Sequence, residues 1–63
     1  LSAQWAKAAA ENNITAAEYL YGAMLVNGDG VTRDIKKGRT FIGKAADKGH
    51  KGAIDALKKL PPN

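Results

Sequence analysis

The fold of this 63-residue chain is decided by residues 28–49, which read GDGVTRDIKKGRTFIGKAADKG. The glycines near its start favour a tight loop, because glycine readily adopts positive φ angles. Asp34 is a favourable N-cap for a helix that we expect over residues 35–48. Gly49 suits the position just after that helix, where left-handed backbone is common. The stretch therefore predicts a loop, a helix and a sharp stop.

Two helices are predicted ahead of this stretch. The first runs from a Ser2 cap to about Asn12-Asn13, which stop it. The second runs from a Thr15 cap to about residue 26, and Glu18 stands three residues after Thr15, in the spacing of a capping box.

A fourth helix is predicted from about residue 51 to residue 59 or 60, and Pro61-Pro62 end it. No segment alternates apolar and polar residues as a half-buried strand would. The sequence therefore predicts an all-α protein of four short antiparallel helices joined by tight turns.

The chain also repeats itself at a spacing of 36 residues. Large apolar residues fall on large ones, as Trp5 does on Phe41, and Asn13 falls on Gly49. Asn and Gly are the residues that most readily take the left-handed conformation at a helix end. Self-similarity of this length is typical of helical repeat arrays, in which stacked units form the core. We therefore expect Trp5 and Phe41 to be core residues rather than platforms for bases or sugars.

These positions resemble the SEL-one-like helical repeats, whose pattern combines small residues, Gly-x-Gly-Val, Asp, an aromatic residue and Ala-Ala-x-x-Gly. The residues that carry the resemblance are Ala17, Gly22, Gly28, Gly30, Val31, Asp34, Phe41, Ala45, Ala46, Gly49 and Ala53. Tyr21, Leu25 and Gly38 depart from the pattern. Gly38, together with the mid-helix Gly43, predicts a looser third helix, since glycine is a poor helix former.

The resemblance implies a right-handed α-superhelix similar to tetratricopeptide arrays, of which this chain is a fragment. Residues 1–16 supply the last helix of one unit, residues 17–52 form a complete repeat, and residues 53–63 form a capping helix and tail. It also implies a scaffold or adaptor for protein complexes, most often bacterial, in signalling or cell-envelope regulation. A periplasmic or secreted location is slightly favoured over a cytoplasmic one.

Charge is unevenly distributed along the chain. Residues 1–32 hold one basic and three acidic side chains, whereas residues 33–63 hold nine basic and three acidic ones. A solvated outer face explains this balance most simply. The alternative is a basic surface for an anionic partner, either nucleic acid or a membrane or cell-wall polymer. We do not expect nucleic acid, because no aromatic residue other than Phe41 lies among the basic ones.

The composition offers little for catalysis. The chain has no cysteine and one histidine, so it can form neither a disulfide nor a thiolate metal site. The Gly28–Val31 loop lacks the Lys-Ser/Thr of a phosphate-binding loop, and no nucleophile, base and orienting group occur together. No apolar stretch is long enough to span a bilayer. We expect no enzyme activity, no cofactor, no metal and no transmembrane segment.

The second helix is the best candidate for a binding site, because it is apolar almost all the way round. One face, with Ala17, Tyr21, Met24 and Leu25, is needed for packing. In arrays of the kind that the chain resembles, the first helix of each unit lines the concave surface. The resemblance therefore places five residues on a surface that binds a protein or peptide: Tyr19, Leu20, Ala23, Val26 and Asn27. Self-association through the same helix is the alternative.

Overall fold

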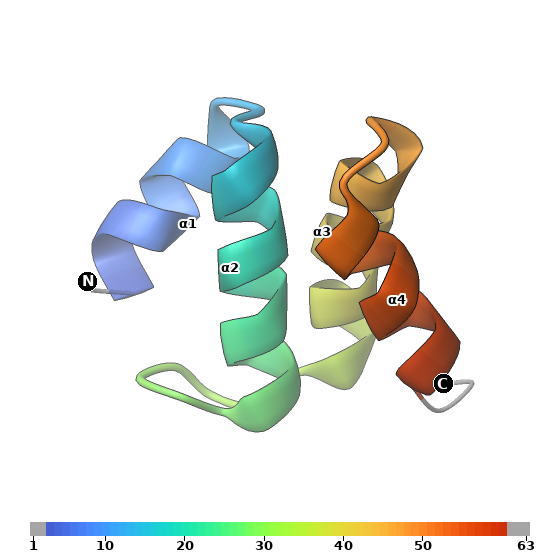
Figure 1. Cartoon of the computed structure of the whole chain (residues 1–63). Coiled ribbons are helices and arrows are strands. Elements are labelled where there is room, and N and C mark those ends of the chain that lie inside the picture. The colour runs from blue at the N-terminus through green and yellow to red at the C-terminus, as the bar shows by residue number, and fades with distance from the viewer. Residues whose placement is uncertain (1–2, 61–63) are drawn as a thin grey trace.

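A computed structural model describes residues 3–60 and places four α-helices and no strand within them (Figure 1). The helices are α1, Ala3–Glu11, α2, Thr15–Asn27, α3, Ile35–Asp47, and α4, Lys51–Lys59. The predicted all-α class is confirmed. The expected Ser2 cap and Pro61-Pro62 stop lie outside the described residues.

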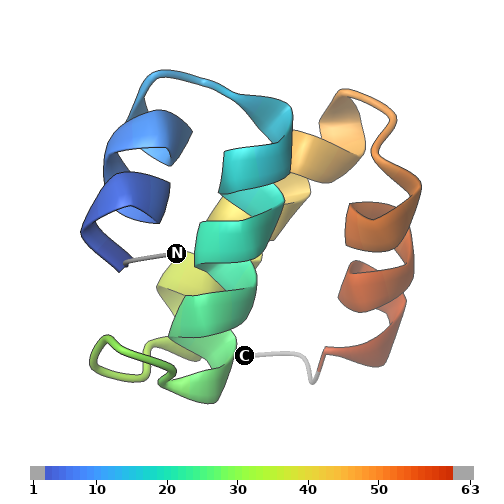
Figure 2. The same cartoon turned by 60° about the vertical axis from the view of Figure 1, so that its left-hand side comes forward.

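The helices pack in chain order. Seen in Figure 2, α2 crosses in front of α3, with α1 on one side of α2 and α4 on the other. The interface between α2 and α3 is the most extensive, followed by those of α1 with α2 and of α3 with α4. The two loops at the top of the figure, after α1 and after α3, therefore connect helices that pack against each other.

These two turns have the same backbone geometry. Asn13 and Gly49 both have positive φ, at 64° and 89°. In the first turn the N–H of Ile14 donates to the carbonyl of Ala9, and in the second the N–H of His50 donates to that of Ala45. Both ends are Schellman motifs, which satisfy the last carbonyls of a helix. The prediction of left-handed backbone at both positions is confirmed.

The N-terminal caps confirm one prediction and correct another. The side chain of Asp34 accepts from the N–H of Lys37, as predicted, and so caps α3. The predicted capping box of α2 is wrong: Ile14 is the N-cap, no side chain caps the helix, and Thr15 is already the first helical residue. The Schellman turn fixes the chain path so that Ile14 takes the cap position, and Glu18 is used for a different contact.

Two apolar clusters form the core. The first lies between α1 and α2, and its buried residues are Ala6, Ala9, Ala10, Ala17, Tyr21 and Leu25. The second joins α3 to α4 around three buried residues, Ile42, Ala45 and Ala53. Small residues in these positions let the helices approach closely.

Trp5 is not a core residue, contrary to the prediction. It is 52% exposed, whereas Phe41, at the equivalent place, is half-buried against the first cluster and meets the Tyr21 ring edge to face. The difference is positional, because α3 has α2 on the side where Phe41 lies, and no described helix lies on the corresponding side of α1.

The third helix is not loosened by Gly38. Gly38 is buried and faces Gly22 across the α2–α3 crossing. A Cβ on Gly38 would lie 2.6 Å from the carbonyl oxygen of Gly22 and 2.7 Å from a methyl group of Val26. The departure from the repeat pattern is therefore explained by close packing of two backbones. Gly43, in contrast, has open space around it.

Candidate protein-interaction surface

The outer side of α2 carries no charge. Glu18 is the only charged residue among the thirteen of this helix, and it is 0% exposed. The sides that face the other helices hold Ala17, Tyr21, Gly22 and Leu25, all buried. What α2 shows to solvent is therefore apolar or neutral, unlike the other helices, each of which exposes charged residues.

Glu18 is buried because it pairs with a lysine from the end of α3. Lys48 Nζ lies 3.0 Å from Glu18 Oε1 and donates to the backbone oxygen of Asn13 at 2.7 Å. Glu18 Oε2 has no hydrogen-bond partner among the described residues. The Lys48 ammonium group thus connects the turn after α1, the first turn of α2 and the turn after α3.

At the start of α4, His50 links that helix to α2. Its Nδ1 accepts from the N–H of Ala53 at 3.1 Å, which caps α4, and its ring stacks on Tyr19 with centroids 4.8 Å apart. Gly52 permits this arrangement, because a Cβ there would lie 3.0 Å from His50 Cε1 and 3.5 Å from Tyr19 Cζ. No capping role was predicted for His50 from the sequence, because histidine is not among the residues that commonly cap helices.

The five predicted site residues lie along α2 but are covered to different degrees. Tyr19 and Val26 are half-buried against the cluster between α3 and α4, and Leu20 is half-buried against the other cluster. Ala23 is half-buried, and Asn27 is exposed. The centre of the surface is therefore Ala23 with Asn27 and the exposed Ala16, while Tyr19, Val26 and Leu20 form its edges.

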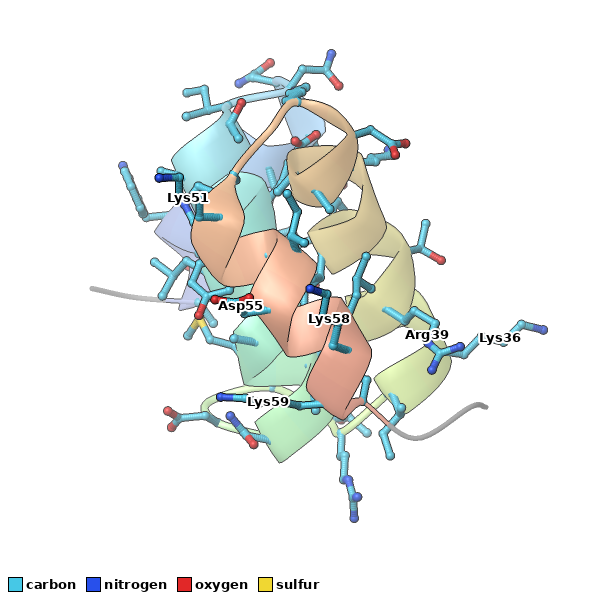
Figure 3. All side chains as sticks on the ribbon, turned by 45° about the vertical axis from the view of Figure 1, so that its right-hand side comes forward. Lys36, Arg39, Lys51, Asp55, Lys58 and Lys59 are labelled. Atoms are coloured by element: carbon cyan, nitrogen blue, oxygen red, sulfur yellow. The ribbon has the colours of Figure 1, made fainter. Side chains whose placement is uncertain are left out.

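Positive charge gathers beside this surface. Figure 3 shows Lys51, Lys58 and Lys59 along the outer side of α4, with Asp55 among them, and Lys36 and Arg39 projecting from α3. Lys51, Lys58 and Lys59 are exposed. Arg39 Nη2 donates to the carbonyl oxygen of Leu60 at 3.5 Å, so this arginine helps hold the end of α4.

Other basic side chains make contacts within the chain. Arg33 Nε donates to the carbonyl oxygen of Val26 at 3.2 Å, and Lys44 Nζ lies 5.3 Å from the centre of the Phe41 ring. Together with Lys48, they show that part of the basic balance is structural. The side chains left for an external anion are mainly those of α4 and the first turn of α3.

A hollow of about 250 Å³ lies elsewhere, between α2, the following loop and the start of α3. Its polar lining comes from Thr32, Arg33, Asp34 and Lys37, and the Asp34 carboxylate is already engaged as the cap of α3. No group of three or more His, Asp or Glu side chains that could hold a metal ion occurs among residues 3–60.

None of the described helices is long and apolar enough to cross a membrane. Comparison with known proteins gave no matching family model, no matching curated protein and no matching solved structure.

Proposed function

We propose that this chain is a non-catalytic interaction module of the SEL-one-like repeat type, and that it binds a protein or peptide on the outer surface of α2. The observation that carries the proposal is the neutrality of that surface. Glu18, the one charged residue of α2, is withdrawn from solvent and paired with Lys48. A solvent-exposed helix face without charges, beside a strongly charged neighbour, is typical of an interaction site.

The repeat supports the family proposal. The turns at Asn13 and Gly49 share their φ sign and their hydrogen bonds at a 36-residue spacing. Equivalent turns at a constant spacing indicate equivalent units, and repeat proteins present extended surfaces for partners. In this arrangement α2 and α4 are equivalent helices of successive units, and the partner lies along α2.

The experiment introduces one charge at the centre of the surface. Ala23→Glu places a carboxylate among Tyr19, Val26 and Asn27, and Ala8→Glu places one at an exposed position of α1 as the matched control. Proteins retained on the immobilised wild-type chain are identified, and the purified candidate is titrated against all three chains. We expect Ala23→Glu to weaken binding at least about tenfold and Ala8→Glu to leave it unchanged. Equal binding by both variants contradicts the proposal.

Self-association uses the same surface and is separated by sedimentation. If α2 packs against a second copy, the wild-type chain sediments as a dimer at micromolar concentration and Ala23→Glu as a monomer. If the wild-type chain sediments as a monomer, self-association is excluded at that concentration and the surface is available to a different protein.

A second candidate function follows from Figure 3, in which lysines of α4 and basic residues of α3 share one side of the molecule. Such a surface suits an anionic partner, and binding to it collapses as salt rises. Lys58→Ala with Lys59→Ala removes two of these charges without touching α2. Loss of binding in this double variant, with normal binding in Ala23→Glu, favours the basic surface over α2.

A further inference from the structure

The hollow between α2, the following loop and the start of α3 combines buried apolar side chains with exposed polar ones. Its lining residues all fall within the segment 21–37, so the segment that forms it is continuous. Tyr21 and Leu25 are each 4% exposed, and Val31 is half-buried beside them. Pockets for drug-sized molecules measure about 300–1,000 Å³. This hollow, at about 250 Å³, therefore suits only a small ligand.

Two cationic side chains line the hollow without an acidic partner. No ion pair joins Arg33 or Lys37 to an acidic residue of the described chain. Asp34, the acidic residue of the lining, accepts from the N–H of Lys37 and so caps α3. Arg33 Nε donates to the carbonyl oxygen of Val26 at 3.2 Å, which tethers the guanidinium group beside the hollow. The lining therefore carries an excess of positive charge.

Tyr21 offers a further polar group from inside the protein. Its ring meets Phe41 edge to face, with ring centroids 5.1 Å apart. Its hydroxyl group has no hydrogen-bond partner among the described residues, and it keeps access to solvent. Because Tyr21 lines the hollow and is otherwise buried, the hydroxyl group faces it. Buried tyrosine hydroxyls usually have a partner, and a ligand in the hollow can supply one.

We propose that this hollow binds a small carboxylate that carries a short aliphatic chain. The carboxylate lies between the Arg33 guanidinium and the Lys37 ammonium groups and accepts from the Tyr21 hydroxyl. Hydrogen bonds from cationic groups to a carboxylate are among the strong ones, and the fork of arginine matches its geometry. The aliphatic chain contacts Leu25 and Val31. Inorganic phosphate lacks such a chain and fits less well.

The carboxylate has two possible sources with the same chemistry: a free short-chain acid, or the C-terminal group of a peptide that ends in an aliphatic residue. In both cases the site is separate from the outer surface of α2, and it does not depend on the function proposed for that surface. The two are tested independently, because the probes used here are small acids and a tripeptide rather than a protein partner.

The test titrates the isotope-labelled wild-type chain with isovalerate and follows its amide resonances by NMR. We expect saturable shifts centred on residues 31–37, with a dissociation constant on the order of 1 mM. Isovaleramide has the aliphatic chain without the charge, and inorganic phosphate has charge without the chain. We expect both to bind at least about fivefold more weakly. Tighter binding of an N-acetylated tripeptide that ends in leucine assigns the site to a peptide C-terminus, and weaker binding assigns it to a free acid.

Variants of single side chains complete the test. Lys37→Met removes one positive charge but keeps the N–H that Asp34 caps, and it weakens isovalerate binding at least about fivefold. Lys36→Met is the matched control, because Lys36 is an exposed lysine of the same helix that does not line the hollow (Figure 3). Tyr21→Phe keeps the ring and removes the hydroxyl group, and weakens binding about threefold. The same spectra show that each variant is folded.

Three results overturn the proposal. The first is the absence of saturable shifts with isovalerate and with the tripeptide. The second is binding of isovaleramide or phosphate as tight as that of isovalerate. The third is an equal effect of Lys36→Met and Lys37→Met, which would show that only the overall charge of the chain matters.

Discussion

The carbonyl oxygen of Gly38 lies within 2.7 Å of the place where Gly22 would carry a Cβ, and the carbonyl oxygen of Gly22 lies within 2.6 Å of the corresponding place on Gly38. Both obstacles are backbone atoms, which cannot turn aside as a side chain can. Any side chain at either position therefore separates α2 from α3. This reciprocal contact sets the spacing of the most extensive helix–helix interface in the molecule.

Alanine at either glycine is expected to destabilise the protein. Gly22→Ala and Gly38→Ala each lower the free energy of unfolding by about 1–3 kcal/mol through overpacking, despite the better helix propensity of alanine. Gly43→Ala is the control, because its Cβ would meet nothing within 4 Å, and it raises stability by up to about 1 kcal/mol. Urea unfolding followed by circular dichroism measures all three, and a Gly22→Ala chain as stable as Gly43→Ala contradicts the crossing.

Removing the ammonium group of Lys48 is expected to destabilise the protein, because Glu18 then stays buried without its charged partner. Lys48→Met leaves a carboxylate that is 0% exposed without its charged partner, and we expect a loss of about 1–3 kcal/mol. Lys48 is itself 38% exposed, so water compensates part of the lost contact. Replacing both residues, with Glu18→Leu added to Lys48→Met, recovers most of the stability. Lys7→Met, on the exposed side of α1, serves as the control and stays near the wild type.

His50 is expected to stabilise the protein in two ways, by capping α4 and by stacking on Tyr19. His50→Ala removes the hydrogen bond to the N–H of Ala53 and the stack on Tyr19, and lowers stability by about 1–3 kcal/mol. His50→Asn restores a capping oxygen but no ring, so it recovers the cap alone. Thermal unfolding measures the three chains, and we expect stability to fall in the order wild type, His50→Asn, His50→Ala. Equal stability of the Asn and Ala variants shows that the cap contributes nothing.

Trp5 and Phe41 occupy equivalent positions but are expected to respond differently to truncation. Trp5→Ala lowers the free energy of unfolding by less than Phe41→Ala does, because Trp5 is 52% exposed. Phe41→Ala removes a ring packed on Tyr21 and lowers stability by more than about 1 kcal/mol, below the loss for a fully buried ring. Chemical denaturation compares the two, and similar losses in both variants contradict the exposed position of Trp5.

Binding at α2 is expected to resist salt. The surface carries no charge, so the dissociation constant changes less than about threefold between roughly 50 and 200 mM salt. A protein that neutralises 6–10 phosphates loses about 10³–10⁵ in affinity over the same range. A titration at three salt concentrations with the partner identified on the wild-type chain makes the comparison. A steep loss with salt assigns the partner to the lysines of α4 instead.

Local chemistry made the helices predictable. Asp34 caps α3 through its own side chain, and Asn13 and Gly49 take positive φ where a Schellman turn requires it. These effects involve residues only a few positions apart, so sequence spacing is sufficient to find them. The candidate surface stays a prediction: the almost uncharged sequence of α2 suggested it, and in the structure Asn27 is exposed while Ala23 is half-buried.

The contacts between helices were decided by the tertiary structure. The sequence suggested that Glu18 completes a capping box and that Gly38 loosens α3, but both residues serve partners far along the chain, Lys48 and Gly22. Trp5 and Phe41 could not be separated by a repeat that treats them alike, because burial depends on whether another helix lies alongside. The sequence alone thus determined the four helices, the Asp34 cap of α3 and the left-handed turns at Asn13 and Gly49, since these depend on local backbone preferences. Only the packed structure decided which equivalent residues are buried, since burial depends on neighbours that the chain brings together in space.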